Sequence, residues 1–177
     1  VYGMIRKAVL DDMPQFDSMF EEYFQYEKKI DSYTAFQRGI FPTHSGIESA
    51  IKNDVVYVYE DNGIICGSVI FDQMQPPEFA DIPWQYVYND EDVMVIHLFI
   101  VRPSHFRQGI ATAMMNYGFD LARNQGCKVL RTECGSQNFP AVLLFKRLGF
   151  ERAAVASIVI EGVVPADGHV FLEKLLD

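Results

Sequence analysis

Apolar residues recur along this chain with two different periods, and the changes of period predict the order of its elements. Residues 5–9 predict a first strand. Apolar residues then follow at helical spacing after Asp11 or Asp12, either of which is a candidate N-cap: Met13, Phe16, Met19, Phe20, Tyr23 and Phe24. Ser45 with Glu48 three residues later has the form of a capping box and predicts a short helix to about Asn53.

The period changes to that of strands after this helix. Residues 55–60 and 64–72 are rich in β-formers and are separated by Asp61, Asn62 and Gly63, which predicts a hairpin. Residues 73–92 hold three prolines and the only tryptophan, and we expect a long loop there. The most continuously apolar run, residues 93–101, predicts a strand inside the sheet with both faces covered.

A strand-helix-strand unit follows. Its helix carries one apolar stripe and ends near Gly126: Ala111, Met114, Met115, Gly118, Phe119 and Ala122. Residues 128–134 then predict a strand parallel to the run at 93–101, with a right-handed crossover. A further striped helix stops at Gly149, and residues 152–161 and 169–174 predict two antiparallel strands. The fold class is therefore mixed α/β, with elements in the order β-α-α-β-β-β-α-β-α-β-β.

The junction at residues 101–112 is the first candidate for chemistry. It runs from the central strand into a loop with Gly109, and the next helix begins there. Helix N-termini present free backbone N–H groups and the positive end of the helix dipole, so they bind anions such as a diphosphate. A tight turn without a ligand also explains one glycine. A second pattern about thirty residues later favours the anion site over a simple turn. It consists of Asn138, Ala141, Phe145, Gly149 and Phe150, spaced N-x-x-A-x-x-x-F-x-x-x-G-F.

Together, these two motifs and the element order resemble the GNAT superfamily of acyl-CoA-dependent N-acetyltransferases. The resemblance covers nearly the whole chain and is most specific over residues 96–150. It implies a central, twisted, mixed β-sheet of about seven strands flanked by about four helices, with the fourth and fifth strands splayed apart. We expect one domain over residues 4–177, and we interpret residues 1–3, before Met4, as a remnant of expression.

The resemblance also implies acetyl-CoA as co-substrate. The pantetheine arm would meet Phe99, Ile100 and Val101 in the gap between the splayed strands. The backbone N–H groups of six loop and helix residues would hold the pyrophosphate: Arg107, Gln108, Gly109, Ile110, Ala111 and Thr112. Asn138 would bond the cofactor, cap its helix, or do both, and Phe145 would pack against the cofactor.

Two positions depart from the family pattern. The family usually has Gln or Arg three residues before the loop glycine, where this chain has Phe106, followed by Arg107. Either the basic residue is shifted by one, or the backbone binds the anion alone. The second departure is Phe145, which replaces a tyrosine proposed to protonate the leaving thiolate. A CoA thiol with a pKa of about 8.5 leaves tolerably without that acid, so catalysis is still allowed.

The expected reaction is direct attack of an amine on the thioester, with the oxyanion stabilised by backbone N–H near Phe99. His97 and Glu133 are the candidate bases that take the amine's proton. A core histidine and a solvent-facing or cation-paired carboxylate are their alternative readings. Cys134 is interpreted as a small buried residue rather than a nucleophile, because it has no evident triad.

Aromatic residues are the candidates for the acceptor site. Trp84 and Tyr86, in the acidic and aromatic loop, would attract a cationic amine, although a solvated lid also explains the loop's charges. The resemblance offers Tyr23, Tyr26 and Tyr33 as alternative walls.

Composition narrows the partners. A net charge of −9 argues against nucleic acid, and no stretch is long and apolar enough to cross a membrane. Three unpaired cysteines and four histidines suggest a reducing cytoplasm and no metal. We therefore expect a cytoplasmic N-acetyltransferase of a small-molecule amine, and a homodimer is compatible with the resemblance. The alternatives are a non-catalytic acyl-CoA-binding or regulatory protein and a protein N-terminal acetyltransferase.

Overall fold

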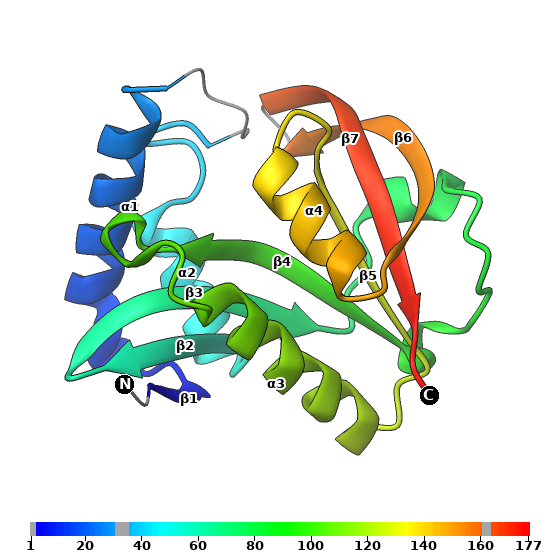
Figure 1. The fold of residues 1–177 in the computed structure, drawn as a ribbon, viewed down its shortest axis with the longest axis horizontal. Helices are drawn as coiled ribbons and strands as arrows, with labels where there is room; N and C mark the ends of the chain where they lie inside the picture. Colours follow the sequence, from blue (N-terminus) through cyan, green and yellow to red (C-terminus); the bar gives the residue numbers. More distant parts are fainter. Residues whose placement is uncertain (1–2, 31–35, 161–163) are drawn as a thin grey trace. The chain divides into compact units, whose positions relative to one another are not determined.

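A computed structural model describes residues 3–30, 36–160 and 164–177 (Figure 1). Its strands are β1 (Met4–Lys7), β2 (Val56–Asp61), β3 (Ile64–Asp72), β4 (Val93–Val101), β5 (Val129–Gly135), β6 (Glu151–Ile160) and β7 (Val164–Leu175). Its helices are α1 (Met13–Glu27), α2 (His44–Lys52), α3 (Ile110–Asn124) and α4 (Phe139–Arg147). The predicted order of elements is confirmed, and the helix and strand bounds lie within a few residues of those expected.

The strands form a seven-stranded sheet in the described part of the chain, in the order β1-β2-β3-β4-β5-β7-β6. β4 and β5 are parallel, whereas β1 with β2, β2 with β3, β5 with β7 and β6 with β7 are antiparallel. The mixed fold class is therefore confirmed. The hairpin between β2 and β3 turns at Asn62 and Gly63, whose φ angles of 52° and 77° suit the tight turn that the sequence predicted.

The chain divides into two compact units. The first contains residues 3–30, Phe36–Phe71 and His97–Gly118, and the second contains Asp72–Ile96 and Phe119–Asp177. β4 and α3 each contribute to both units. The parallel ladder between β4 and β5 lies within the second unit and pairs Val93–Val95 with residues 129–131, although β4 continues to Val101 and β5 to Gly135.

In the first unit, helices cover both faces of β2 and β3 (Figure 1). Phe16 and Met19 of α1 and Ile47 of α2 belong to one apolar cluster with residues of β2 and β3, so α1 and α2 cover one face. The start of α3 covers the other, because a Cβ added at Gly67 would lie 2.9 Å from the Sδ of Met114. A side chain at position 67 would push these elements apart.

In the second unit, the loop of residues 73–92 packs on one face of the strands. Phe79 and Ile82 of the loop share an apolar cluster with strand residues that include Val95 and Phe171. Two short 3-10 turns, at Pro77–Asp81 and Asp90–Asp92, interrupt the loop. The predicted long loop is thus confirmed, and it buries Phe79 and Ile82 while Met74 and Val87 are exposed.

The N-terminus of α2 differs from expectation. Thr43 is the N-cap, and its Oγ1 accepts a hydrogen bond from the N–H of Gly46 at 3.1 Å. The predicted capping box of Ser45 and Glu48 is therefore wrong. Glu48 instead binds Lys52 one turn later, with its Oε1 2.9 Å from the Nζ. Ser and Thr cap equally well in sequence patterns, and the backbone conformation decides which one lies outside the helix.

Candidate active site

The loop before α3 has an unusual backbone. The φ angle of Arg107 is 62° and that of Gly109 is 79°, so two residues of three are left-handed. A left-handed conformation is strained for arginine, and such strain clusters at functional sites. A Cβ added at Gly109 would meet nothing within 4 Å, so the space above this glycine is open.

Six consecutive backbone amides at this junction form no hydrogen bond to any described residue. Among the described residues, the hydrogen bonds of the loop end with the N–H of Phe106, which binds the carbonyl of Pro103, and resume with the N–H of Ala113, which binds the carbonyl of Gly109. The first N–H groups of α3 lack partners as at any helix start, and the curled loop adds those of residues 107–109. Arg107, Gln108 and Gly109 are exposed, so these donors are accessible to an anion.

Phe106 and Arg102 anchor this loop to the first unit. The ring of Phe106 packs edge-on against Tyr26, with centroids 5.2 Å apart. The buried guanidinium of Arg102 donates to the carbonyl of Ile65 at 2.9 Å and to that of Gln15 at 3.3 Å. Phe106 therefore occupies the expected Gln or Arg position as an apolar anchor, and Arg107 next to it is exposed.

The strand before the loop is irregular at one residue. Leu98 has a φ of 44°, a left-handed conformation inside β4. A left-handed residue interrupts the extended backbone of the strand at this point. The half-buried His97 and Phe99 flank it, and Ile100 is buried in the apolar cluster beside α1.

The second unit holds a pair that the sequence did not reveal. Glu133 on β5 contacts His169 on β7, through its Oε2 and the Nδ1 of the imidazole. The sequence predicts Glu133 as a candidate base, whereas it predicts His169 only as part of a strand. The missing signal was tertiary, because 36 residues separate the pair.

Cys134, the next residue on β5, is not a nucleophile in this environment. Burial, aided by the adjacent carboxylate of Glu133, raises the pKa of its thiol to about 12. The thiol is therefore protonated near neutral pH, and the thiolate is the reactive form. The side chain is half-buried, less than the predicted burial, and the raised pKa agrees with its interpretation as a residue that is not a nucleophile.

Asn138 and Phe145 lie on α4. The Oδ1 of Asn138 accepts a hydrogen bond from the N–H of Ala141 at 3.4 Å, so this residue caps the helix. Phe145 is 4% exposed, and its ring packs against Phe150 with centroids 5.1 Å apart. Cofactor contact by either residue stays a prediction.

Two of the predicted acceptor residues, Trp84 and Tyr86, form hydrogen bonds through their side chains. Trp84 donates its indole N–H to the carbonyl of Phe79 at 2.8 Å, and the Arg131 guanidinium lies 4.4 Å from the centre of its ring. The hydroxyl of Tyr86 donates to Glu151 at 2.9 Å, and this hydrogen bond raises the pKa of the phenol.

The tyrosines proposed as alternative walls belong to the N-terminal part of the chain. Tyr23 is buried in the first unit beside Phe36 and Tyr26. Tyr33 lies outside the described residues. Acceptor contact by any of these aromatic residues remains a prediction.

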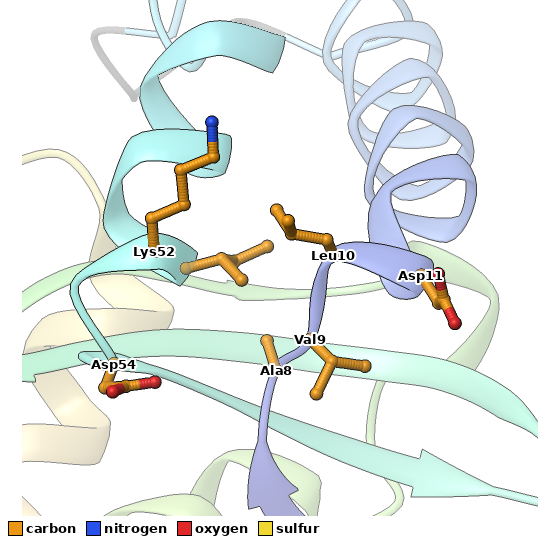
Figure 2. A pocket seen from close by; sticks show the side chains of 7 residues that line it. Ala8, Val9, Leu10, Asp11, Lys52 and Asp54 are labelled. Carbon is orange, nitrogen blue, oxygen red and sulfur yellow. The ribbon is translucent and has the colours of Figure 1, made fainter.

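A shallow hollow of about 360 Å³ lies elsewhere, beside residues 8–11 and the end of α2 (Figure 2). Val9 and Leu10 present apolar side chains to it, with Lys52 and Asp54 on the opposite side. None of the predicted site residues lines this hollow.

The described residues hold neither a cluster of metal-ligating side chains nor a helix that could span a membrane. Within the described ranges, His, Cys, Asp and Glu side chains do not gather in groups of three or more that suit a metal ion. None of the described helices combines the length and the apolar character that crossing a membrane requires.

Comparisons with known proteins were made for the sequence and for the fold. The model of the Acetyltransferase (GNAT) family matches residues 13–150. An uncharacterized N-acetyltransferase of Methanocaldococcus jannaschii is 27% identical over 151 residues, which are 85% of this chain and 62% of that protein. The chain thus matches less than two thirds of that relative's length.

Solved structures share the fold. A proposed acetyltransferase from Staphylococcus aureus Mu50 has a TM-score of 0.73 and 27% identity, covering 99% of this chain and 100% of that one. A proposed acetyltransferase from Salmonella typhimurium, solved with its cofactor acetyl-CoA, has a TM-score of 0.69 and 17% identity, covering 100% of this chain and 95% of that one. With the family match over residues 13–150, the strand order and the glycine-containing loop before α3, the chain belongs to the GNAT family of acetyltransferases.

Proposed function

We propose that this protein transfers an acetyl group from acetyl-CoA to the amine of a small molecule. The observation that carries the proposal is the run of six free amides over residues 107–112, with left-handed residues at Arg107 and Gly109. Family membership and a structural relative solved with acetyl-CoA support the choice of donor.

The loop fits the diphosphate of acetyl-CoA. Consecutive N–H groups in a curled backbone, continued by a helix N-terminus, form a concave donor set for phosphate oxygens. The open space at Gly109 lets an anion approach the backbone closely. Phe106 points to the aromatic side chains of α1, so the backbone supplies the hydrogen bonds and exposed Arg107 supplies charge.

In the reaction, the neutral amine attacks the thioester carbonyl carbon. The new C–N bond forms, the C–S bond breaks, and sulfur leaves with the electron pair. The left-handed conformation of Leu98 supports a role for β4 backbone N–H groups in stabilising the oxyanion, because it interrupts the extended backbone of the strand. The net charge of −9 favours a cationic amine as the acceptor.

The loop assignment is tested with a matched pair of variants. Gly109→Asp places a carboxylate at the proposed diphosphate site, and Gly63→Asp makes the same change in the hairpin turn. Both glycines have similar φ angles, 79° and 77°, and open space above them. We expect Gly109→Asp to lower the affinity for CoA at least about tenfold by calorimetry, and Gly63→Asp to leave it unchanged. Equal affinities in both variants would contradict the assignment.

The reaction is tested by the release of CoA thiol from acetyl-CoA with polyamines, amino acids, aminoglycosides and peptides. We expect release that depends on a small-molecule amine. Release with peptides alone would favour N-terminal acetylation of proteins. Binding of CoA without release in the whole panel would favour a non-catalytic acyl-CoA-binding protein.

A further inference from the structure

Arg102 is a buried arginine that directly follows β4 and begins the loop leading to α3. Its backbone N–H donates to the carbonyl of Cys66 on β3 at 2.7 Å, and its Nε donates to the carbonyl of Ile65 at 2.9 Å. Its Nη1 and Nη2 reach α1, where they donate to the Oγ of Ser18 at 3.2 Å and to the carbonyl of Gln15 at 3.3 Å. One residue thus joins the start of the loop to β3 and α1, all within the first unit.

The side chain of Gln15 ties these two elements to each other as well. Its amide nitrogen donates to the carbonyl of Gly63 at 2.7 Å, and its amide oxygen accepts the N–H of Ile65 at 2.7 Å. The acceptors that Arg102 finds on α1 and β3 are therefore fixed relative to one another. Because a guanidinium is planar and its five N–H donors point in fixed directions, these acceptors determine where the loop begins.

A single carboxylate faces this guanidinium in the described part of the chain. The Oε2 of Glu22 on α1 lies 3.9 Å from the Nη1 of Arg102, is buried, and forms no hydrogen bond to a described residue. That separation is too long for a hydrogen bond, so the donors of Arg102 are bound by neutral carbonyl and hydroxyl oxygens. The directions of its donors therefore matter here in addition to its charge, and a lysine ammonium does not reproduce those directions.

Hydrogen bonds continue from Arg102 into the loop. The carbonyl of Arg102 accepts the N–H of His105 at 2.8 Å, and the carbonyl of Pro103 accepts the N–H of Phe106 at 3.2 Å, which forms one 3-10 turn. The ring of Phe106 then packs against Tyr26 on α1. The segment from Arg102 to Phe106 is thus held to α1 at both of its ends.

The next residue, Arg107, is the strained one. Its φ of 62° costs free energy for a residue with a side chain, and such a conformation persists only where its surroundings impose it. The fixed segment lies on its N-terminal side, and α3 begins at Ile110 on its C-terminal side. If the segment were released, Arg107 could relax to an ordinary conformation, and the N–H groups of residues 107–109 would lose their shared direction.

We propose that Arg102 is a positioning residue for the diphosphate of acetyl-CoA, because it holds the curled loop in its binding conformation while its own donors bind protein acceptors. This inference rests on the proposed function. A loop that is already ordered spends no binding free energy on ordering. A loop that adopts its binding conformation only about a tenth of the time binds about tenfold more weakly.

The binding test titrates CoA into the wild-type protein, Arg102→Gln and Arg102→Lys by calorimetry. We expect both variants to lower the affinity at least about tenfold, because lysine keeps the charge but lacks the directed donors. Calorimetry separates this effect from misfolding, since unfolded protein lowers the number of sites, whereas a relaxed loop weakens each site. Wild-type affinity in Arg102→Lys would overturn the proposal.

A milder variant keeps the test decisive where the Arg102 variants do not fold. Ser18→Ala removes one acceptor of the guanidinium and is expected to lower the affinity for CoA about two- to tenfold. Unchanged affinity in Ser18→Ala would then contradict the proposal.

The matched control is Arg6 on β1, a second arginine of the first unit. Its Nη1 lies 2.8 Å from the carboxylate of Asp12, just before α1, and its Nε lies 2.9 Å from that of Glu60 on β2. Arg6→Gln is expected to lower the free energy of unfolding but to leave the affinity for CoA unchanged. A loss of affinity equal to that of Arg102→Gln would mean that general destabilisation explains both, and the positioning role would be wrong.

A kinetic comparison locates the effect on the diphosphate. S-acetylpantetheine carries the thioester but no diphosphate. With the panel amine acetylated fastest, Arg102→Lys is expected to raise the KM for acetyl-CoA at least about tenfold and to change kcat/KM for S-acetylpantetheine less than about twofold. Equal losses with both donors would contradict the positioning role.

The Gly109→Asp variant separates this inference from the proposed function. If Gly109→Asp binds CoA as tightly as the wild-type protein, the loop is not the diphosphate site and the proposed function loses its main support. If Gly109→Asp loses affinity while both Arg102 variants retain it, the role of Arg102 alone is wrong.

Discussion

Single residues at this site are defined by what surrounds them. Glu133 and Cys134 are neighbours in sequence, but they alternate across β5 and meet different environments. The carboxylate pairs with His169, whereas the thiol is half-buried and its pKa rises to about 12. By residue type alone, Cys134 is the better nucleophile of the two, but its environment keeps the thiol protonated near neutral pH.

The raised pKa of the thiol predicts a low reactivity of Cys134 in the folded protein. Its alkylation by iodoacetamide at pH 8 is expected to be at least about tenfold slower in the folded protein than in urea, because the thiolate is the nucleophile. Peptide mass spectrometry at several pH values measures it. Equal rates in the folded and unfolded protein would contradict a raised pKa.

The same pKa affects stability at high pH. The unfolded thiol ionises near its ordinary pKa of about 8.5, while the folded thiol keeps its proton up to about 12. Between these values the folded state binds more protons, so its contribution to the free energy of unfolding falls as pH rises. Urea titrations between pH 8 and 10 should show a smaller fall for Cys134→Ala than for wild type.

At the scale of elements, the ends of helices carry the specific chemistry. α3 begins at a curled loop with free amides, whereas α2 and α4 begin at capping side chains, Thr43 and Asn138. A cap satisfies an amide that would otherwise bind water or a ligand. The contrast separates structural helix ends from the candidate anion site.

The cap of α2 gives a direct prediction. Thr43→Ala is expected to lower the free energy of unfolding by about 1 kcal/mol, measured by urea denaturation. Ser45→Ala, a matched change two residues later in the exposed first turn, is expected to change it by less than about 0.5 kcal/mol. A larger loss for Ser45→Ala would restore the capping box.

At the scale of tertiary structure, two buried residues of opposite charge fix the loop of residues 73–92. Arg131 on β5 lies opposite Glu173 on β7. The carboxylate of Glu173, 1% exposed, accepts the N–H groups of Gln85 and Tyr86 at 2.9 and 3.0 Å. Arg131 donates to the carbonyl of Tyr86 at 2.8 Å. Two strands thus hold one short piece of loop backbone.

The buried position of Glu173 predicts that a small change at this residue lowers the free energy of unfolding strongly. Glu173→Gln removes the buried carboxylate that accepts the N–H groups of Gln85 and Tyr86 and is expected to lower the free energy of unfolding by about 1–3 kcal/mol. The control is Glu151→Gln, because Glu151 is opposite Glu173 on β6 but exposed, with an expected loss below about 1 kcal/mol. Combining Glu173→Gln with Arg131→Met should cost less than the sum of the single changes.

Interactions between residues close in sequence explain which features of the fold the sequence alone predicts. Side-chain periods of two and of three to four residues mark strands and helices wherever one face is buried, so the element order was predictable. Gly109 and the spacing of Asn138 to Gly149 likewise pointed to the family. The choice of Thr43 over Ser45 was not predictable, because both side chains cap helices and only the backbone shows where α2 begins.

By itself, the sequence determined the fold class, the family and the position of the loop proposed to bind an anion, because these depend on interactions between residues close in the chain. Tertiary structure alone decided that Phe106 packs inward, that the 73–92 loop is held by Arg131 and Glu173, and that Glu133 meets His169. The physical reason is strand register: which side chains meet across a sheet depends on pairing between segments far apart in sequence, and no local pattern encodes that pairing.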